Sequence, residues 1–425
     1  MYGSKPSTDT GATKLLSGGK ISFKSESIPK SYEYGDTIIP AVNAECTTYR
    51  LTPVTGSTAT PGNIIRFEIP SNGVADFRKS SLFFTASATQ TGGVFVCFSN
   101  FIGTIFKKIR ITAGTLEIID TNDYNLIASF LIWTYNSTEN FANAGPFSGI
   151  DSLANRKTAA AGKQYQVYLN LEALTSKPWP VEIMDDILKI EITLDQPNNC
   201  LEADGTGTNP TFSITNMEWW YDIINLPRGY INMLKSTPFG FVFRNTTLVK
   251  NNFSSAQGDI IISEKTACMT DVITIMRNQP DVSSITVADK FITWNYNAAT
   301  SFQLRHNGHY HPPQVVPCNA GGAYVWWYYL RWLGEWSFND GPSINNGFSQ
   351  ITSTNFVTNK FMMPVCLQTF QDSALLNGSD VVSTTDNILF SIVLNAAPGV
   401  TQEVDSIVFS EYLVTFCNGK TYITK

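Results

Sequence analysis

The feature that most constrains this chain is an internal repeat, because four segments recur in the same order in its two halves. A hairpin-like stretch comes first, then a compact aromatic run, an alternating strand and a closing strand. The pairs are 110–116 and 304–310, 123–133 and 323–333, 186–194 and 386–394, and 212–224 and 406–417. The apolar alternation of 188–194 returns 200 residues later in 388–394. We therefore expect one β-rich module that is used twice.

The rest of the chain consists of short alternating segments separated by turn residues, which is typical of β-sandwiches and jelly rolls. Only 124–133 and 323–333 have the pattern of helices. The sequence thus predicts an all-β protein with two consecutive eight-stranded jelly-roll β-barrels, short helices and long loops. We expect a flexible N-terminal arm, a first barrel and a second barrel, with Pro227-Arg228-Gly229 marking the boundary between the barrels. These parts span 1–36, 37–226 and 227–425.

In the second half, the Asn307-Gly308 dipeptide predicts a tight hairpin turn. Two long connections rich in Asn, Gly and Ser, about 136–162 and 334–355, are expected to carry a function or a contact. Strands are expected at 239–243, 259–263, 271–276, 285–287, 291–296, 361–369, 387–395 and 406–416.

Composition argues for a protein with large cores and few surface charges. Hydrophobic residues make up 43% of the 425 residues, whereas charged residues make up 15%, against roughly 25% in an average soluble domain. A surface of this kind is typical of a subunit packed by neighbours, although a secreted β-sandwich could share it. The net charge of −6 argues against binding nucleic acid through clustered Lys and Arg.

The seven cysteines are scattered and include no C-x-x-C pair, so we expect free thiols in a reducing compartment. Cys97 and Cys417 have apolar neighbours and are expected in the core. The N-terminal residues lack the apolar stretch of a signal peptide, and no run approaches the roughly 18 apolar residues of a membrane span.

All three histidines, His306, His309 and His311, lie within six residues. A hairpin would place His306 opposite His309, and a zinc or nickel site of that shape is conceivable. The alternative is a plain polar hairpin that precedes Pro312-Pro313, and we favour it because no fourth ligand lies nearby in sequence.

Motifs for catalysis and nucleotide binding are missing. Gly162-Lys163 lacks the earlier glycine of a phosphate-binding loop, and Gly205 with Gly207 lacks the third glycine of a dinucleotide fingerprint. With three histidines on one hairpin, a Ser-His-Asp or Cys-His arrangement has almost no place to form.

Two acidic pairs invite a chemical interpretation. Asp185-Asp186 resemble paired acids for glycoside hydrolysis, but adjacent strand residues point to opposite faces, so a turn role before the strand is expected. Glu202, Asp204 and Gly205 form an acidic loop that calcium could occupy, and an ordinary solvated turn is the preferred alternative.

Two aromatic clusters are candidates for a sugar-binding platform. Because their rings are consecutive, they would lie on both faces of a strand or around a helix, which fits burial in a core or a subunit interface better than a one-sided platform. The clusters are Trp219-Trp220-Tyr221 and Trp326-Trp327-Tyr328-Tyr329 with Trp332 and Trp336.

The layout over about 40–425 resembles the double jelly-roll major capsid proteins of tailless icosahedral double-stranded DNA viruses. That lineage includes membrane-containing bacteriophages, adenovirus-like hexons, virophages and the large nucleocytoplasmic viruses. The resemblance lies in the hairpin and helix of 109–133 and 302–333, in Leu375-Leu376-Asn377-Gly378-Ser379 before the strand 387–395, and in the closing strand 406–416.

This resemblance implies a structural virion protein and no enzyme, with no catalytic, cofactor-binding or metal-binding residues. It implies a homotrimer that forms a pseudo-hexameric capsomer and contacts neighbouring capsomers and minor capsid or penton proteins. The N-terminal arm would lie inside, against such a partner or an internal membrane, and no sequence-specific nucleic acid binding is expected. The loops 134–163 and 334–356 would lie at the outer end or clasp a neighbour.

Two alternatives stay open from the sequence. One is a capsid protein with a single jelly roll and a protruding domain, whose halves would be dissimilar. The other is a tandem β-sandwich that binds or hydrolyses glycans, with exposed aromatic rings beside a carboxylate pair.

Overall fold

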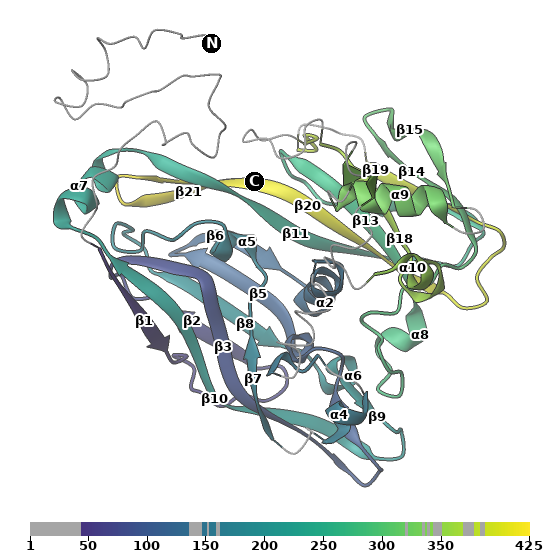
Figure 1. Cartoon of the computed structure of the whole chain (residues 1–425), viewed down its shortest axis with the longest axis horizontal. Helices are drawn as coiled ribbons and strands as arrows, with labels where there is room; N and C mark the ends of the chain where they lie inside the picture. The colour runs from purple at the N-terminus through teal and green to yellow at the C-terminus, as the bar shows by residue number, and fades with distance from the viewer. Residues whose placement is uncertain are drawn as a thin grey trace, which may run out of the picture.

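The fold is that of a computed structural model of the whole chain, in which two β-barrels lie side by side (Figure 1). The structure describes residues 44–135, 147–150, 153–158, 162–318, 322–333, 336–337, 341–342, 351–368, 378–382 and 387–425. The predicted N-terminal arm therefore lies outside the described residues, as do much of the two long loops and Leu375-Leu376-Asn377.

The first barrel is made of two antiparallel four-stranded sheets that face each other. One has the order β1 (Glu45–Leu51), β10 (Thr208–Asn225), β3 (Val74–Thr91) and β7 (Lys163–Val167). The other has the order β2 (Ile64–Glu68), β8 (Leu188–Leu194), β5 (Phe106–Ala113) and β6 (Leu116–Thr121). A short pair, β4 (Val96–Phe98) and β9 (Leu201–Ala203), extends one end.

The second barrel repeats this plan. One sheet has the order β11 (Phe239–Phe253), β20 (Gln402–Cys417), β13 (Met269–Asn278) and β18 (Met362–Cys366), with β21 (Lys420–Thr424) also paired to β20. The other has the order β12 (Gln257–Ile262), β19 (Ile388–Leu394), β14 (Ala299–His306) and β15 (His309–Pro317). The pair β16 (Trp336–Ser337) and β17 (Gly341–Pro342) lies apart.

The two strand orders match place by place, so each half has the same topology. The first four-stranded sheet, β1-β10-β3-β7, corresponds to β11-β20-β13-β18, and the second, β2-β8-β5-β6, corresponds to β12-β19-β14-β15. This arrangement of eight strands in two antiparallel sheets is a jelly roll. The predicted fold class and the predicted duplication are confirmed.

The helices are short. Both predicted helices are confirmed, as α2 (Tyr124–Tyr135) and α9 (Ala323–Trp332). The remaining helical segments are η2 (Ile102–Ile105), α4 (Leu153–Thr158), α5 (Glu172–Thr175), α6 (Pro197–Cys200), α7 (Arg228–Ser236), α8 (Gln279–Val282) and α10 (Ser353–Asn359). The prediction of two long loops was therefore partly wrong, because α4 lies within the first loop and α10 begins in the second loop.

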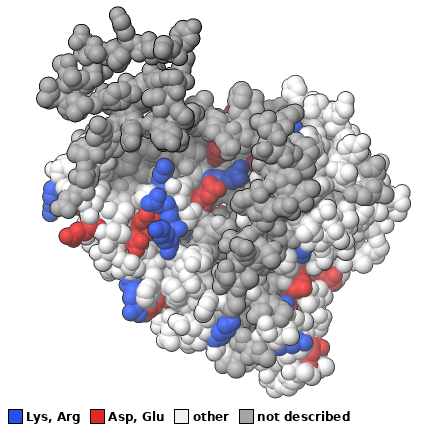
Figure 2. Space-filling view, in the orientation of Figure 1, with Lys and Arg blue, Asp and Glu red and all other residues white. Residues whose placement is uncertain are grey.

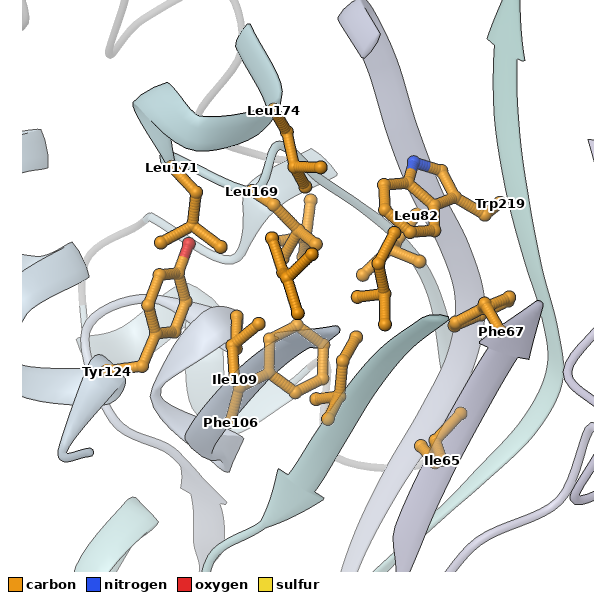
Figure 3. Packing of buried hydrophobic residues seen from close by; sticks show 14 of the residues in the cluster. Ile65, Phe67, Leu82, Phe106, Ile109, Tyr124, Leu169, Leu171, Leu174 and Trp219 are labelled. Carbon is orange, nitrogen blue, oxygen red and sulfur yellow. The ribbon is translucent and has the colours of Figure 1, made fainter. Parts of the chain in front are cut away.

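Strand alternation explains the first core. In β8 every second side chain from Leu188 to Leu194 is buried, and the residues between them point outward. Figure 3 shows buried side chains of β2, β3, β5 and β10, among them Phe67, Leu82, Phe106 and Trp219, meeting between the sheets. Burying one such side chain stabilises the fold by about 1.5–3 kcal/mol.

The hairpin turn at Asn307-Gly308 is confirmed. Both residues have positive φ, 51° and 72°, which is the conformation that a two-residue hairpin loop requires. His306 and His309 accordingly pair as the last residues of β14 and the first of β15.

Two predicted strands are wrong. Residues 285–287 and 291–296 form turns, with one isolated bridge between Trp294 and Lys360. Their apolar side chains anchor the segment instead, since Phe291, Ile292 and Trp294 are all buried in the second core. The alternation indicated burial correctly, but the burial is that of a turn segment and not of a strand. Conversely, β1 was not predicted, and the predicted strand 239–243 is one end of the much longer β11.

All seven cysteines are free in the structure. Cys97 is buried as predicted, and burial raises the pKa of its thiol to about 11. Cys417 is only half-buried, so its predicted core position is wrong.

The longest strands of the second barrel join the two barrels. β11 and β20 pair without a register shift from Phe239 opposite Phe416 to Phe253 opposite Gln402. We call this pair the β11–β20 ribbon. One end belongs to the second core through Phe253 and Val404, whereas Phe243 and Phe416 at the other end belong to the first core. Figure 1 shows the ribbon, with β21, running along the first barrel.

The predicted boundary at 226/227 falls in the short connection between β10, which ends at Asn225, and α7, which begins at Arg228. The boundary stays a prediction, because each core contains side chains from the other half of the chain. The helix α2 of the first half places Ile127 and Phe130 in the second core and Tyr124 in the first.

Trp179 is the aromatic centre of the junction. It is fully buried, and its ring meets Phe241 and Phe416 of the ribbon edge-on at 5.6 and 5.7 Å between ring centres. Its indole N–H donates to the Ala173 carbonyl at 2.7 Å, so the ring has one orientation.

A buried polar cluster forms a second junction. Arg156 of α4 donates to Glu202 at 2.8 Å and to Asp289 of the second half at 3.1 Å. The Asp289 backbone N–H donates in turn to Glu202 at 3.0 Å. Burial raises the pKa of Glu202, and the Arg156 charge opposes that rise. Lys290 next to it donates to the carbonyls of Asn198, Leu201 and Ser284 at 2.6–3.2 Å.

We predict that Trp179→Ala lowers the free energy of unfolding by about 3–5 kcal/mol, because the substitution leaves a cavity between the barrels. Tyr168→Ala is the matched control, since the Tyr168 side chain is 52% exposed. Denaturant unfolding followed by fluorescence and circular dichroism measures both. Equal losses for the two variants would contradict the role of Trp179.

We also predict a pH dependence from Lys290. Burial lowers the pKa of its ammonium from 10.5 to about 8. Between these values the unfolded chain holds a proton that the folded chain has lost, so the stability contribution of Lys290 increases as the pH rises. Relative to Lys290→Met, the wild type should gain about 2 kcal/mol between pH 8 and pH 10. A flat difference in unfolding free energy across this range would contradict the prediction.

Candidate functional site

The outward face of β1 and β10 is the most organised surface of the first barrel. On β10 burial alternates, so Trp219 and Tyr221 point into the core while Glu218 and Trp220 point outward. Register places Arg50 of β1 opposite Trp220. We call Arg50, Glu218 and Trp220, together with Phe83 of β3, the β1–β10 face.

Charge and hydrogen bonds hold Trp220 in place on this face. The Arg50 guanidinium donates to both Glu218 carboxylate oxygens at 2.8 Å, and the Trp220 indole N–H donates to Glu218 at 3.0 Å. Arg50 also lies over the Trp220 ring, 4.8 Å from its centre. The hydrogen bond from Arg50, followed by that from Trp220, lowers the pKa of Glu218.

Phe83 completes the face, with its ring 5.3 Å from that of Trp220. Oriented Trp and Arg side chains at a surface are typical of the residues that carry protein–protein binding energy. The β1–β10 face therefore has the chemistry of a contact with another protein, and no group on it is arranged for a reaction.

The strand β1 forms the edge of this face. Among the described strands it is the end strand of its sheet, and its residues from Glu45 to Arg50 are exposed. Exposed edge strands pair readily with other chains unless something covers them.

The histidine cluster does not converge on one point. His306 is buried, with its Nδ1 atom 3.0 Å from the Ser379 hydroxyl, whereas His309 is exposed. His311 is half-buried, and its pKa is lowered by desolvation and by the neighbouring His309. Across the described ranges, no group of three or more His, Cys, Asp or Glu side chains is placed to hold a metal ion.

The acidic candidates lie in turns. Asp185 and Asp186 are exposed in the bend before β8, and the Asp185 backbone N–H donates to the Gly419 carbonyl at 2.8 Å. Their predicted turn role is confirmed. Glu202 lies in β9, just before the turn, and is buried in the ion pair with Arg156, so the solvated position expected for it is wrong.

Asp204 closes a turn with its carboxylate. The Thr206 hydroxyl donates to it at 2.6 Å and the Val94 backbone N–H at 2.5 Å, and these bonds lower the pKa of Asp204 to about 2. Gly162 and Gly205 both have positive φ, 106° and 78°, at turns. Gly162 precedes β7 and Gly205 follows β9, so neither opens a helix as a phosphate-binding loop would.

The second aromatic cluster divides between core and surface. On α9, Tyr329 and Trp332 are buried in the second core, whereas Trp326, Trp327 and Tyr328 are half-buried. This confirms the expectation that the consecutive rings serve several sides of one element. Trp336 lies in the short strand β16.

Two cavities lie beside the described helices. One of about 280 Å³ lies at the junction of the barrels, where Leu131 and Tyr135 of α2 face Arg244 of β11. The other, of about 350 Å³, lies between α9 and the strands β15 and β18, with Tyr328 and Arg331 in its lining. Among the helices in the described ranges, none is long and apolar enough to cross a membrane.

Sequence reasoning missed the β1–β10 face. The run Trp219-Trp220-Tyr221 on an alternating strand does indicate one ring pointing away from its neighbours. Nothing in the sequence indicates that Arg50 pairs with Glu218, because the two residues lie 168 positions apart.

No protein-family model and no curated protein sequence matches the chain. Solved structures do match over nearly their whole length. VP54 of the virus PBCV-1, in a crystal structure fitted into a reconstruction of the virophage Sputnik, has a TM-score of 0.63 at 12% identity, covering 92% of this chain and 99% of that one.

A chain of the PBCV-1 virus capsid has a TM-score of 0.61 at 12% identity, covering 92% of this chain and 99% of its own. The Faustovirus major capsid protein has a TM-score of 0.60 at 9% identity, covering 95% of this chain and 96% of its own. Structural similarity at such low identity establishes the fold alone, which is the double jelly roll of these capsid proteins. The function has to be argued from the surfaces of the chain.

Proposed function

We propose that this chain is a major capsid protein, the structural subunit of an icosahedral virus shell. The observation that carries the proposal is the duplicated jelly roll, which it shares end to end with capsid proteins of PBCV-1 and Faustovirus. The organised surfaces suit contacts between proteins. We assign the chain no catalytic residue and no cofactor, and we place it in the virion.

We further propose that three copies form a pseudo-hexagonal capsomer. Duplication supports this arrangement, because three chains with two similar barrels each can occupy a six-fold lattice position while keeping closed three-fold symmetry. Neighbouring capsomers and minor or penton proteins would then surround each trimer.

The junction inside the chain suggests how the trimer closes. There, the β11–β20 ribbon of the second barrel packs on the first barrel through Phe241 and Phe416. The β1–β10 pair holds the same place in the first barrel as the ribbon holds in the second. Pseudo-six-fold symmetry therefore brings the β1–β10 face against the second barrel of the next chain.

The two alternatives receive less support. A capsid protein with one jelly roll and a protruding domain would have unlike halves, whereas the strand orders here are equal. A glycan-binding tandem sandwich would expose aromatic rings beside a carboxylate pair. The exposed Trp220 does lie beside Glu218, but Arg50 neutralises that carboxylate.

We predict that the purified chain runs as a trimer, near three times 47.0 kDa, by size exclusion with light scattering. Trp220→Glu should weaken the trimer at least about 30-fold, the loss of a typical interface hot spot, without changing the circular dichroism spectrum of the folded chain. Ile64→Glu is the control, because Ile64 is 51% exposed on the opposite sheet. A monomeric wild-type chain would overturn the proposal.

We also predict separate roles for the arm and the barrels. Deleting residues 1–35 should leave trimers intact, because the described barrels begin with β1 at Glu45, and should weaken lattice assembly through the lost contacts of the arm with a neighbouring capsomer, a minor protein or a membrane. Light scattering measures the trimer, and electron microscopy counts the assembled shells. Monomers after the deletion would contradict this division.

A further inference from the structure

The duplicated barrels differ in the outward face of one matching sheet. In the first barrel, the sheet β2-β8-β5-β6 carries alternating charges, and we call its outward side the charged face. Its ionic side chains are Arg66, Glu68, Lys108, Arg110, Glu117, Asp120, Lys189 and Glu191.

These charges satisfy one another. Glu191 lies 2.6 Å from Arg66 and 3.8 Å from Arg110, and Lys108 lies 2.7 Å from Asp120. The charged face is therefore a solvated surface of neighbouring ion pairs, and its charges need no partner protein to neutralise them.

The equivalent sheet of the second barrel, β12-β19-β14-β15, presents mostly uncharged side chains. We call its outward side the neutral face. Its apolar members are Ile261, Tyr310, Val315, Leu389 and Val393, and its polar members are Ser301, Gln303 and Ser391. Ile261, Tyr310 and Val315 are about half exposed, at 48%, 49% and 52%.

The central strands show the difference position by position. In β8 the outward residues are Lys189, Glu191 and Thr193, and in β19 they are Leu389, Ser391 and Val393. The matching sheet of the first barrel folds with charges at these positions, so this sheet type does not need apolar side chains on its outward side. The exposed Ile261, Tyr310 and Val315 of the neutral face therefore indicate a surface that binds another protein.

Figure 2 shows the distribution of charge on one side of the whole molecule. Blue and red side chains lie mainly over the first barrel and the lower part, whereas the described residues at the right, where Figure 1 places the second barrel, are largely white.

The neutral face carries two charges, and their positions indicate the partner. Arg305 of β14 lies opposite Leu389, and Asp259 of β12 lies opposite Ser391, so they flank β19 from opposite sides and different rows. The Ser391 hydroxyl donates to Asp259 at 2.5 Å and orients its carboxylate.

These opposite corners make the face complementary to itself. A two-fold axis that lies in the face, midway between the two residues and at right angles to the line joining them, brings Arg305 of each copy over Asp259 of the other. Leu389, which lies on β19 between the two charges, then meets its own equivalent. A two-fold contact of this kind is the usual way in which one surface binds a copy of itself.

We propose that the neutral face binds the neutral face of a second copy of this chain across a two-fold axis. This inference rests on the proposed function in one respect, namely that the two copies belong to different trimers of a shell. The contact then links neighbouring capsomers and is distinct from the contact that closes the trimer.

The test reverses each charge and then mixes the variants. Arg305→Asp and Asp259→Arg, each as preformed trimers, should each lose association between trimers by about 10- to 100-fold, because like charges then face each other twice. Mixed in equal amounts, the two variants should associate again as strongly as the wild type, since every corner pair is once more opposite in sign. Cross-correlation between two fluorescent labels, one on each variant, measures this recovery.

Leu389→Lys gives the neutral face the residue type of the charged face and should weaken association between trimers. The matched control is Lys189→Glu, which changes the equivalent position of the charged face and should leave association unchanged. Circular dichroism checks that every variant is folded.

The outcomes separate the two proposals. Single variants without effect, or a mixture that does not recover, overturn the two-fold contact while the trimer stands. If the variants dissociate into monomers, the neutral face belongs to the contact within the trimer, and this result also overturns the proposed contact between trimers. If the wild-type chain never forms trimers, the proposed function is overturned. The two-fold contact still stands in that case if monomers associate and the mixed charge-reversal variants recover association.

Discussion

The continuous pairing of β11 with β20 is the constraint on which the rest of the molecule depends. The two strands stay in one register over 15 residues, about 50 Å at the usual rise per residue. One end closes the second jelly roll, and the other end lies on the first core beside Trp179. A slip of β11 by one residue along β20 would turn Phe241 away from Trp179 and would expose buried side chains of β11. The ladder of backbone hydrogen bonds between these two strands thus sets how the second barrel meets the first.

The junction combines this apolar contact with buried charge, and the two have different effects. Apolar contacts around Trp179 supply stability without strict geometry, whereas Arg156, Glu202 and Asp289 must meet at hydrogen-bonding distance or leave a charge unpaired. The segment that carries Asp289 and Lys290 therefore has one low-energy position on the first barrel. That rigidity suits the proposed role of the chain as the subunit of a shell. The contrast between the charged and neutral faces then distinguishes two barrels that are otherwise built alike.

Much of the fold could be predicted from the sequence, because alternation and turn residues are local properties. The hairpins, the helices α2 and α9, and the strands β8 and β19 were all predicted from such patterns. Burial without a sheet misled the prediction at 291–296, where Phe291 and Trp294 anchor a turn. The site was harder to predict, because Arg50 and Glu218 meet across 168 residues and the neutral face appears only when strands of one sheet are compared. Pairing between distant strands leaves no local pattern.

The helix α2 makes the stability of each barrel depend on the other. It belongs to the first half, yet Ile127 and Phe130 are buried among side chains of the second. Separating the barrels would expose these side chains to water, at a cost of about 1.5–3 kcal/mol for each. The two halves therefore form one cooperative unit in spite of their duplicated topology, and neither half carries a complete core of its own.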